Sequence, residues 1–168
     1  MAGPRAQPRR YVAVVGPGDA AEQSELVAHA EEVGQALAQR GAVVVCGGLG
    51  GVMAAVCRGA AAAGGTSVGL LPGVDRAAAN PWVTFALPTG LGEARNVCVA
   101  RSADAVVAIG GGYGTLSEIA FALRAGTPVV GLRTWALADA GIRPVDSPQD
   151  AAELAVTLAE AAGGGGAS

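Results

Sequence analysis

The sequence contains no lysine, and all 11 of its basic residues are arginines. A chain without lysine cannot hold pyridoxal phosphate as an imine, and it cannot form a P-loop, which places a lysine on the nucleotide phosphates. Its one histidine, His29, falls within a helical pattern. One histidine excludes both a Ser-His-Asp triad and a histidine-rich metal site. We therefore expect no metal centre, and we interpret His29 as a surface residue.

Positive charge and long apolar runs are also scarce. The formal net charge is −3, which does not favour a surface for nucleic acid or anionic membrane. No apolar run reaches the roughly 18–20 residues that span a bilayer, and the N-terminus lacks the apolar core of a signal peptide. We predict a cytoplasmic protein without nucleic-acid or membrane partners. The widely spaced Cys46, Cys57 and Cys98 match no metal-ligand pair or disulfide framework, and we interpret them as small buried hydrophobic residues.

Apolar segments alternate with helical patterns along the 168 residues, which is a length typical of one domain. Near-continuous apolar strands separated by helices indicate a parallel sheet that is covered on both faces. The predicted fold is a single doubly wound α/β sheet of the Rossmann type. Strands are predicted within residues 10–16, 42–46, 64–73, 82–87, 104–109 and 127–132, and helices within 17–41, 52–63, 91–102 and 114–126, with a short extended piece and a closing helix in 142–160 and an irregular stretch at 74–81.

The two ends of the chain differ from this pattern. Residues 1–9 are polar and interrupted by proline, and residues 161–168 contain a run of glycines. We expect a mobile segment at 1–9, one phosphate- or nucleotide-binding domain at 10–160, and a disordered tail at 161–168.

Glycines recur where the predicted strands end. The carboxyl ends of parallel strands share one edge of the sheet, so five glycine-bearing turns are predicted to meet there, most of them at helix N-termini. Backbone N–H groups and positive helix ends make such an edge an anion site. The turns lie at residues 16–18, 47–51, 72–73, 88–90 and 110–114, and the candidate phosphate-binding residues within them are Gly16, Pro17, Gly18, Gly47, Gly48, Gly111, Gly112, Tyr113 and Gly114.

The first glycine turn raises the question whether the phosphate compound is a dinucleotide such as NAD. The stretch GPGDAA matches the dinucleotide pattern GxGxxA. A dinucleotide site also needs an acidic residue at the end of the second strand, and that strand ends in Cys46-Gly47-Gly48 instead. This argues against NAD.

Three polar residues are predicted at the same edge. Arg95 and Asn96 fall in the first turns of a helix, where the arginine could bind a phosphate with two hydrogen bonds and the asparagine could add a neutral donor and acceptor. Arg101 lies further from the edge and is interpreted as structural. Glu118 has two readings. With Thr115 it fits the helix-capping pattern T-x-x-E; alternatively, its carboxylate faces a bound nucleotide and stabilises the transition state for cleavage of an N-glycosidic bond.

Two stretches resemble the Lonely Guy-like family, whose members were once widely labelled lysine decarboxylases. Residues 92–120, GEARNVCVARSADAVVAIGGGYGTLSEIA, resemble the signature in which an Arg-Lys pair precedes PGGxGTxxE. Residues 46–73, CGGLGGVMAAVCRGAAAAGGTSVGLLPG, resemble the second glycine turn and its helix. The similarity covers about residues 10–132 and is greatest to the branch with the molybdenum cofactor carrier proteins, as in VVGPG, GLLPG and TGLGEARN.

The resemblance implies roles for single residues. Arg95 and Glu118 match the catalytic arginine and glutamate, and Gly111, Gly112, Gly114 and Thr115 match the phosphate-binding loop. Gly110 stands where the family motif has proline, and Asn96 stands where it has lysine. The decarboxylase label does not fit a chain without lysine.

Two functions follow from the resemblance. One is carrier-like binding of a small phosphorylated ligand, a nucleoside monophosphate or the molybdenum cofactor, with no required cofactor. The other is a nucleoside 5′-monophosphate phosphoribohydrolase, of the cytokinin-activating type, that releases a free base. The resemblance also implies a homo-oligomer, a dimer or a tetramer.

Overall fold

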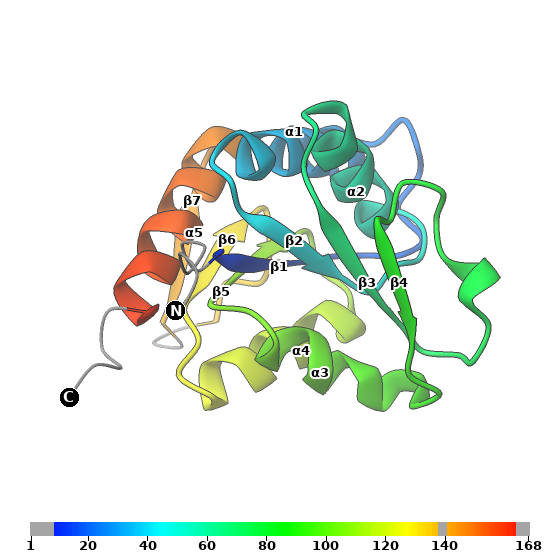
Figure 1. The fold of residues 1–168 in the computed structure, drawn as a ribbon. Coiled ribbons are helices and arrows are strands. Elements are labelled where there is room, and N and C mark those ends of the chain that lie inside the picture. Colours follow the sequence, from blue (N-terminus) through cyan, green and yellow to red (C-terminus); the bar gives the residue numbers. More distant parts are fainter. Residues whose placement is uncertain (1–8, 138–140, 164–168) are drawn as a thin grey trace, which may run out of the picture.

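Residues 9–137 and 141–163 are described by the computed structural model. They form one seven-stranded sheet with the order β4-β3-β2-β1-β5-β6-β7, in which every neighbouring pair is parallel (Figure 1). The predicted doubly wound parallel sheet is confirmed. Its elements are β1 (Tyr11–Val15), α1 (Glu25–Gln39), β2 (Val43–Cys46), α2 (Val52–Ala62), β3 (Ser67–Leu71), β4 (Phe85–Pro88), α3 (Arg95–Arg101), β5 (Ala105–Ile109), α4 (Tyr113–Arg124), β6 (Val129–Leu132), β7 (Ile142–Val145) and α5 (Pro148–Gly163), with 3₁₀ turns η1 (Arg76–Ala78) and η2 (Gly92–Ala94).

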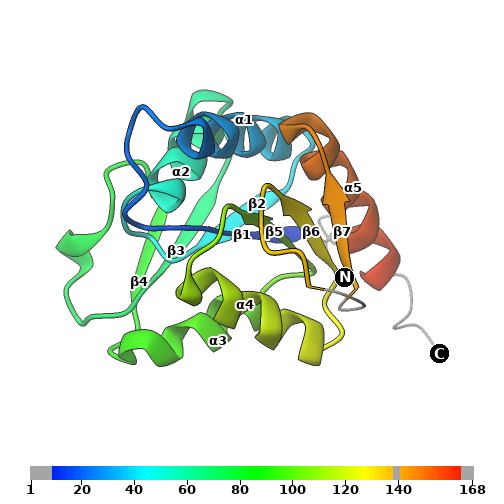
Figure 2. The ribbon, with the colours of Figure 1, turned by 180° about the vertical axis from the view of Figure 1, so that it is seen from behind.

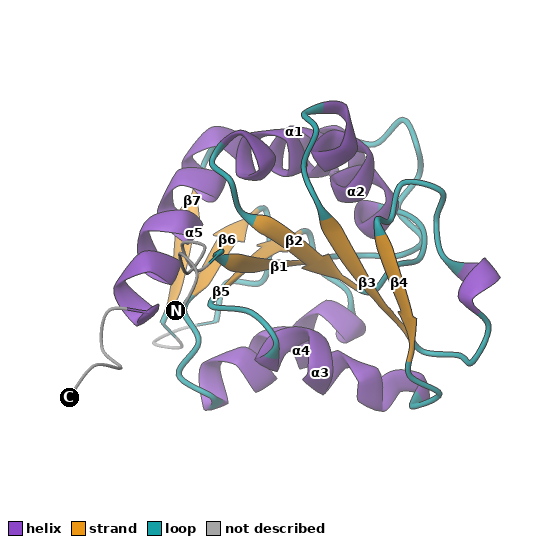
Figure 3. Ribbon diagram, in the orientation of Figure 1, coloured by secondary structure: helices purple, strands orange, loops and turns teal. Residues whose placement is uncertain are grey.

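Helices cover both faces of the sheet. Figures 1 and 2 show α1, α2 and α5 on one face and α3 and α4 on the other, and Figure 3 shows the orange sheet between the two purple layers. All five residues of β5 and four of the five in β1 are buried, because these central strands contact a helix layer on each side. The strand order reverses between β1 and β5, so the turns after these two strands diverge to opposite faces and leave a crevice.

The first two helices cross in direct backbone contact. A Cβ on Gly34 of α1 would lie 2.1 Å from the carbonyl oxygen of Val56, and one on Gly59 of α2 would lie 1.9 Å from that of Glu31. Each helix therefore has glycine where the other presents its backbone. This close packing requires glycine at both crossing positions.

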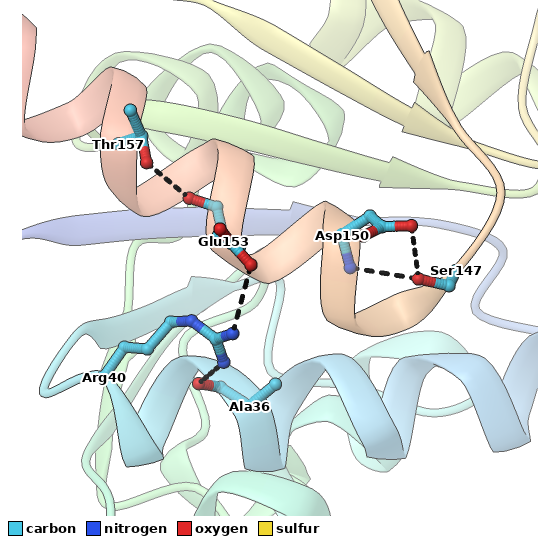
Figure 4. Close-up of polar contacts among 6 residues, drawn as sticks. All are labelled: Ala36, Arg40, Ser147, Asp150, Glu153 and Thr157. Carbon is cyan, nitrogen blue, oxygen red and sulfur yellow. Dashed lines mark hydrogen bonds and ion pairs between the residues drawn. The ribbon is translucent and has the colours of Figure 1, made fainter.

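The last helix is fixed at its start and along its side (Figure 4). Asp150 donates its backbone N–H to Ser147 Oγ (3.1 Å), and this hydroxyl donates to the Asp150 carboxylate (2.7 Å). Arg40 at the end of α1 donates from Nη1 to the carbonyl of Ala36 (3.0 Å), and its Nη2 lies 3.8 Å from Oε2 of Glu153 in α5. The contact between Arg40 and Glu153 joins α5 to α1 on the same face of the sheet.

Some predicted boundaries and environments differ from the structure. β4 begins at Phe85 rather than at residue 82, because the hydroxyls of Ser67 and Thr84 exchange hydrogen bonds with each other's backbone N–H where a ladder would otherwise start (3.0 and 3.1 Å). The helix predicted at 91–102 is a 3₁₀ turn followed by α3, and the irregular stretch 74–81 contains η1.

His29 is not a surface residue. Its side chain is only 16% exposed, on a helix that packs against both α2 and α5. Cys46 and Cys57 are buried as predicted, with their Sγ atoms 3.4 Å apart, whereas Cys98 is only partly buried.

The predicted terminal segments lie mostly beyond the described residues, which leave out 1–8 and 164–168. Helix α5 continues to Gly163, so residues 161–163 of the predicted tail are helical. None of the helices within the described ranges has the length and hydrophobicity needed to span a bilayer.

Candidate functional site

A cavity of about 320 Å³ opens at the carboxyl edge of the sheet, between the turns that follow β1 and β5. We call it the rim cavity. It lies at the reversal of strand order, which is the usual ligand position in open α/β sheets. Ten of the predicted site residues line it: Gly16, Pro17, Gly18, Arg95, Asn96, Gly112, Tyr113, Gly114, Thr115 and Glu118.

One wall of the rim cavity is the N-terminus of α4. The first hydrogen bond of this helix runs from the N–H of Leu116 to the carbonyl of Gly112 (2.9 Å). The N–H groups of Tyr113, Gly114 and Thr115 precede it, and none of the side chains that the structure describes caps the helix. Free N–H groups at the positive end of a helix are a binding site for an anion.

The capping interpretation of Thr115 and Glu118 is wrong. The N-cap residue is Gly112, so Thr115 is the third helical residue and cannot be the cap. Both side chains are instead buried, at 3% and 8% exposure, and both line the rim cavity. The pattern T-x-x-E fits a helix cap, and it fits equally well a pair of buried residues within the helix, as Thr115 and Glu118 are.

Gly110 determines the path of the loop before α4. Its φ is +67°, its N–H donates to the carbonyl of Leu132 (3.2 Å), and a Cβ there would lie 2.7 Å from Leu26. Proline has φ near −65° and no N–H, so it cannot occupy this position. The glycine that replaces the family's proline therefore gives this loop a backbone conformation that proline would exclude.

Arg95 forms the floor of the rim cavity. It is 7% exposed, and its Nη1 donates to the carbonyl oxygens of Gly47 (2.5 Å) and Leu70. Its Nε is buried without a hydrogen-bond partner among the described residues. Burial lowers the pKa of Arg95 below its ordinary value, and the charge of Glu118 partly opposes this. A guanidinium stays protonated in proteins, so Arg95 contributes a fixed positive charge held by two backbone carbonyls.

Glu118 is a buried carboxyl group beside that charge. Burial raises its pKa from an ordinary 4.5 to about 8, although the positive charge of Arg95 acts in the opposite direction. At neutral pH the carboxyl group is therefore mainly protonated. In this form it can donate a hydrogen bond to an anionic ligand.

Asn96 and Gly47 support the rim cavity, Asn96 from within its lining and Gly47 from outside it. Asn96 donates to Ser117 Oγ (3.1 Å), which donates to the carbonyl of Gly114 (2.7 Å), so α3 is joined to the first turn of α4. Gly47 lies beneath the cavity, where a Cβ would be 2.5 Å from both Arg95 Nη1 and Met53 Sδ.

Two predicted residues are directed away from the rim cavity. Gly48 packs against Leu71, and its N–H donates to Cys46 Sγ (3.3 Å). Gly111 packs against Trp135. Neither residue lines the rim cavity. The turns at 72–73 and 88–90 do not line it either, and they hydrogen-bond to each other.

Sequence reasoning missed Asp19 and Met53, which also line the rim cavity. Asp19 directly follows the predicted Gly18 and was part of the quoted GPGDAA stretch. Met53 follows the second glycine turn, and its side chain reaches from α2 to contact both Gly18 and Gly47. Nothing in the local sequence marks a methionine in a helix as a cavity residue rather than a core residue.

Comparisons with known proteins give one matching family and one similar sequence. The model of the SLOG cluster4 family matches residues 9–161. An uncharacterized protein of Archaeoglobus fulgidus is 37% identical over 146 residues, covering 87% of this chain and 94% of its own.

Two solved structures with similar folds are named for the molybdenum cofactor. The molybdenum cofactor binding protein of Rippkaea orientalis has a TM-score of 0.84 at 33% identity, covering 91% of this chain and 99% of its own. The molybdenum cofactor carrier protein of Chlamydomonas reinhardtii has a TM-score of 0.81 at 36% identity, covering 90% and 98%.

Proposed function

This chain belongs to the SLOG cluster4 family, and from that membership and the geometry of the rim cavity we propose that it binds a small phosphorylated, ring-bearing ligand and acts as a carrier. The ligand class comprises nucleoside monophosphates and pterin phosphates of the molybdopterin type. The names of the two similar structures support the pterin phosphates within this class.

The observation that carries the proposal is the uncapped start of α4 above a buried arginine. Tyr113, Gly114 and Thr115 offer three backbone N–H groups, and Arg95 supplies a fixed charge in the lining of the same cavity. A phosphate group accepts several hydrogen bonds and carries the charge that both features favour. Because Arg95 Nη1 is held by two carbonyls, only the other guanidinium nitrogens are left for a ligand, so the helix N-terminus supplies most of the donors.

The neutral form of Glu118 supports the binding proposal. Stabilising an oxocarbenium-like transition state requires an ionised carboxylate, whereas a pKa of about 8 leaves Glu118 mainly neutral at pH 7. A neutral carboxyl group donates a hydrogen bond to a phosphate or sugar oxygen without repelling it. The structure thus supplies a reason for retention of the ligand.

Titration calorimetry in a buffer without phosphate tests the proposal. We expect binding of at least one ligand from a panel of nucleoside monophosphates and a pterin phosphate, and a loss of tenfold or more in affinity for Arg95→Gln. Arg101→Gln is the matched control, because Arg101 is an exposed residue at the other end of the same helix. Absence of binding to every compound in the panel by the folded parent protein would contradict the proposal.

A phosphoribohydrolase is the second candidate, and the pairing of Arg95 with Glu118 in one cavity favours it. Mass spectrometry of nucleoside monophosphates incubated with the protein would detect free base. If Glu118 acts as a carboxylate, release of base increases as the pH rises through about 8 and is lost in Glu118→Gln. Equal release by the parent and this variant would exclude Glu118 from catalysis.

We also propose that the protein is a homo-oligomer. Phe85 and Leu87 on the edge strand β4 are 57% and 47% exposed, and Leu91 nearby in the chain is 50% exposed. Phe85 and Leu87 pair with Val68 and Leu70 of β3, so their side chains lie on the face of the sheet that α3 and α4 cover elsewhere. An apolar sheet face of this kind is suited to burial against a second copy.

A further inference from the structure

Two free cysteines are in contact where β2 meets α2. Cys46 ends β2, Cys57 lies in α2, and both residues are fully buried. Their Sγ atoms are 3.4 Å apart, whereas a disulfide bond is about 2.05 Å long, so the sulfur atoms need to approach by only about 1.3 Å to form one. The two thiols are therefore placed for a covalent bond between them.

The cysteine pair lies next to the rim cavity. Cys46 Sγ is 4.0 Å from the carbonyl oxygen of Met53, a residue that lines the rim cavity. Cys57 follows Met53 by one turn of α2. Gly47, directly after Cys46, accepts the hydrogen bond from Arg95 Nη1 on its carbonyl oxygen (2.5 Å). One of the two cysteines is thus adjacent in the chain to the group that holds Arg95.

Hydrogen bonds make Cys57 the more nucleophilic of the two thiols. The hydrogen bond with Cys46 lowers the pKa of the Cys57 thiol, and burial acts in the opposite direction. Hydrogen bonds with Ser67 and Asn80 lower this pKa further. The contact with Cys57 raises the pKa of Cys46, and burial adds to this. Because the thiolate is the reactive form of cysteine, Cys57 ionises first and Cys46 remains its S–H donor.

From these contacts we propose that Cys46 and Cys57 are a site of reversible oxidation, at which a peroxide converts the two thiols to a disulfide and thereby weakens phosphate binding in the rim cavity. The effect on binding rests on the proposed function, whereas formation of the disulfide does not.

The oxidation proceeds in two steps. The Cys57 thiolate attacks one oxygen of hydrogen peroxide, the O–O bond breaks, and the other oxygen leaves as hydroxide, which becomes water with the proton that Cys57 had lost. The sulfur of Cys46 then attacks the sulfenic acid on Cys57, the S–O bond breaks, and the hydroxyl group leaves as water with the proton of Cys46. The two sulfur atoms together lose two electrons, and one peroxide becomes two molecules of water.

The disulfide should move the glycine turn at 47–51 rather than the elements on either side of it. Helix α2 is fixed by Gly59, which lies in backbone contact with Glu31 of α1. Strand β2 is paired with β3 as far as Cys46. The movement that closes the gap between the sulfur atoms therefore falls on the turn directly after Cys46.

This turn holds Arg95 in place. Gly48 donates its N–H to Cys46 Sγ (3.3 Å), and this hydrogen bond is lost when the sulfur moves toward its partner. When the neighbouring carbonyl of Gly47 moves with it, Arg95 Nη1 loses one of its two backbone acceptors. The positive charge of the proposed phosphate site is then held less firmly, which lowers the affinity for an anion.

Treatment of the full chain with hydrogen peroxide tests both parts of the proposal. The background variant is Cys98→Ala, which removes the third cysteine, so that a disulfide within the chain must join Cys46 to Cys57. Intact mass spectrometry should show the loss of two hydrogen atoms, reversed by a thiol reductant. Nuclear magnetic resonance should show faster exchange of the Gly48 amide proton. Calorimetry should show that the oxidised protein binds inorganic phosphate about tenfold more weakly.

Cys57→Ala in the same background is the matched control, with Cys46→Ala as its counterpart, because neither variant can form the disulfide. Peroxide also oxidises methionine, which adds an oxygen atom to the mass, and Met53 lines the rim cavity. The treated controls should keep their phosphate affinity within twofold. An equal loss of affinity in the controls would assign the effect to methionine and overturn the coupling between the disulfide and the rim cavity.

The remaining outcomes separate this inference from the proposed function. A folded background protein that does not lose two hydrogen atoms would overturn the oxidation site. A disulfide that leaves the phosphate affinity unchanged would overturn the coupling alone. Absence of phosphate binding by the reduced protein would contradict the proposed function together with the coupling, while the intact mass would still decide whether the disulfide forms.

Discussion

Replacing Glu118 by glutamine should make the protein more stable, and the gain should depend on pH. Glutamine resembles the protonated carboxyl group that the buried site favours. A carboxyl group with pKa 4.5 when unfolded and about 8 when folded contributes stability that is complete below pH 4.5 and is lost as the pH rises through 8. Because one pKa unit corresponds to about 1.4 kcal/mol, the full loss is at most about 4–5 kcal/mol. Most of it falls between pH 5 and pH 8.

Urea unfolding of the parent and Glu118→Gln at pH 5, 6, 7, 8 and 9 measures this effect. The stability of the variant relative to the parent should rise by about 3 kcal/mol from pH 5 to pH 8 and change little above that. Glu93→Gln, at an exposed position of η2 just before Arg95, should give a nearly constant difference. A constant difference for Glu118→Gln as well would refute the argument that burial keeps this carboxyl group neutral.

Three further predictions concern the backbone and the surface. Gly110→Pro should lower the free energy of unfolding, measured with urea, by about 3 kcal/mol or more, because proline excludes the φ of +67° and removes the hydrogen bond to Leu132. Gly110→Ala, which keeps the N–H, should lower it by only roughly 1–2 kcal/mol. Gly59→Ala should cost about 2 kcal/mol or more in the same assay because its Cβ would overlap the carbonyl of Glu31, whereas Gly73→Ala, with no atom within 4 Å, should be nearly neutral. Leu87→Glu should reduce the mass measured by light scattering to that of the monomer, and an unchanged oligomer would contradict the proposed interface.

The centre of the sheet could be predicted from sequence because its central strands are almost entirely buried, whereas the edge strands β4 and β7 are partly exposed. Strands such as Ala105–Ile109 are continuous apolar runs, and glycine turns separate them from helices with a clear apolar face. Boundaries were less predictable where side chains replace backbone pairing, as Ser67 and Thr84 do before β4. Periodicity records which residues are apolar, and it contains no information about hydroxyls that bond to a neighbouring strand.

The candidate site was predictable only in part, for a related reason. Parallel strands must end at one edge, so the glycine turns after β1 and β5 were correctly expected to lie together. Which turns form a cavity depends on where the strand order reverses, and this cannot be read from the turns themselves. Gly48 and Gly111 therefore matched a pattern without lining the cavity, while Met53 lined it without matching any pattern. Glu118 was ambiguous because a cap and a buried carboxyl group can share the same spacing.

The charges of the rim cavity connect ligand binding to protonation. Among the residues that the structure describes, Arg95 is the one basic residue that lines it, beside the acidic Asp19 and Glu118, and a phosphate monoester carries about −1.5 to −2 at neutral pH. With a phosphate bound, negative charge already exceeds the single positive charge of Arg95, and ionisation of Glu118 would add to this excess in a buried environment. A bound phosphate should therefore raise the pKa of Glu118 above its value of about 8 in the free protein. Above pH 8 the protein must then take up a proton when it binds the ligand, and its affinity must fall with rising pH.

Calorimetry at pH 9 in two buffers with different ionisation enthalpies measures that proton directly. Proton uptake that is present in the parent and absent in Glu118→Gln would assign it to this carboxyl group, whereas no uptake by the parent would mean that phosphate binds away from Glu118.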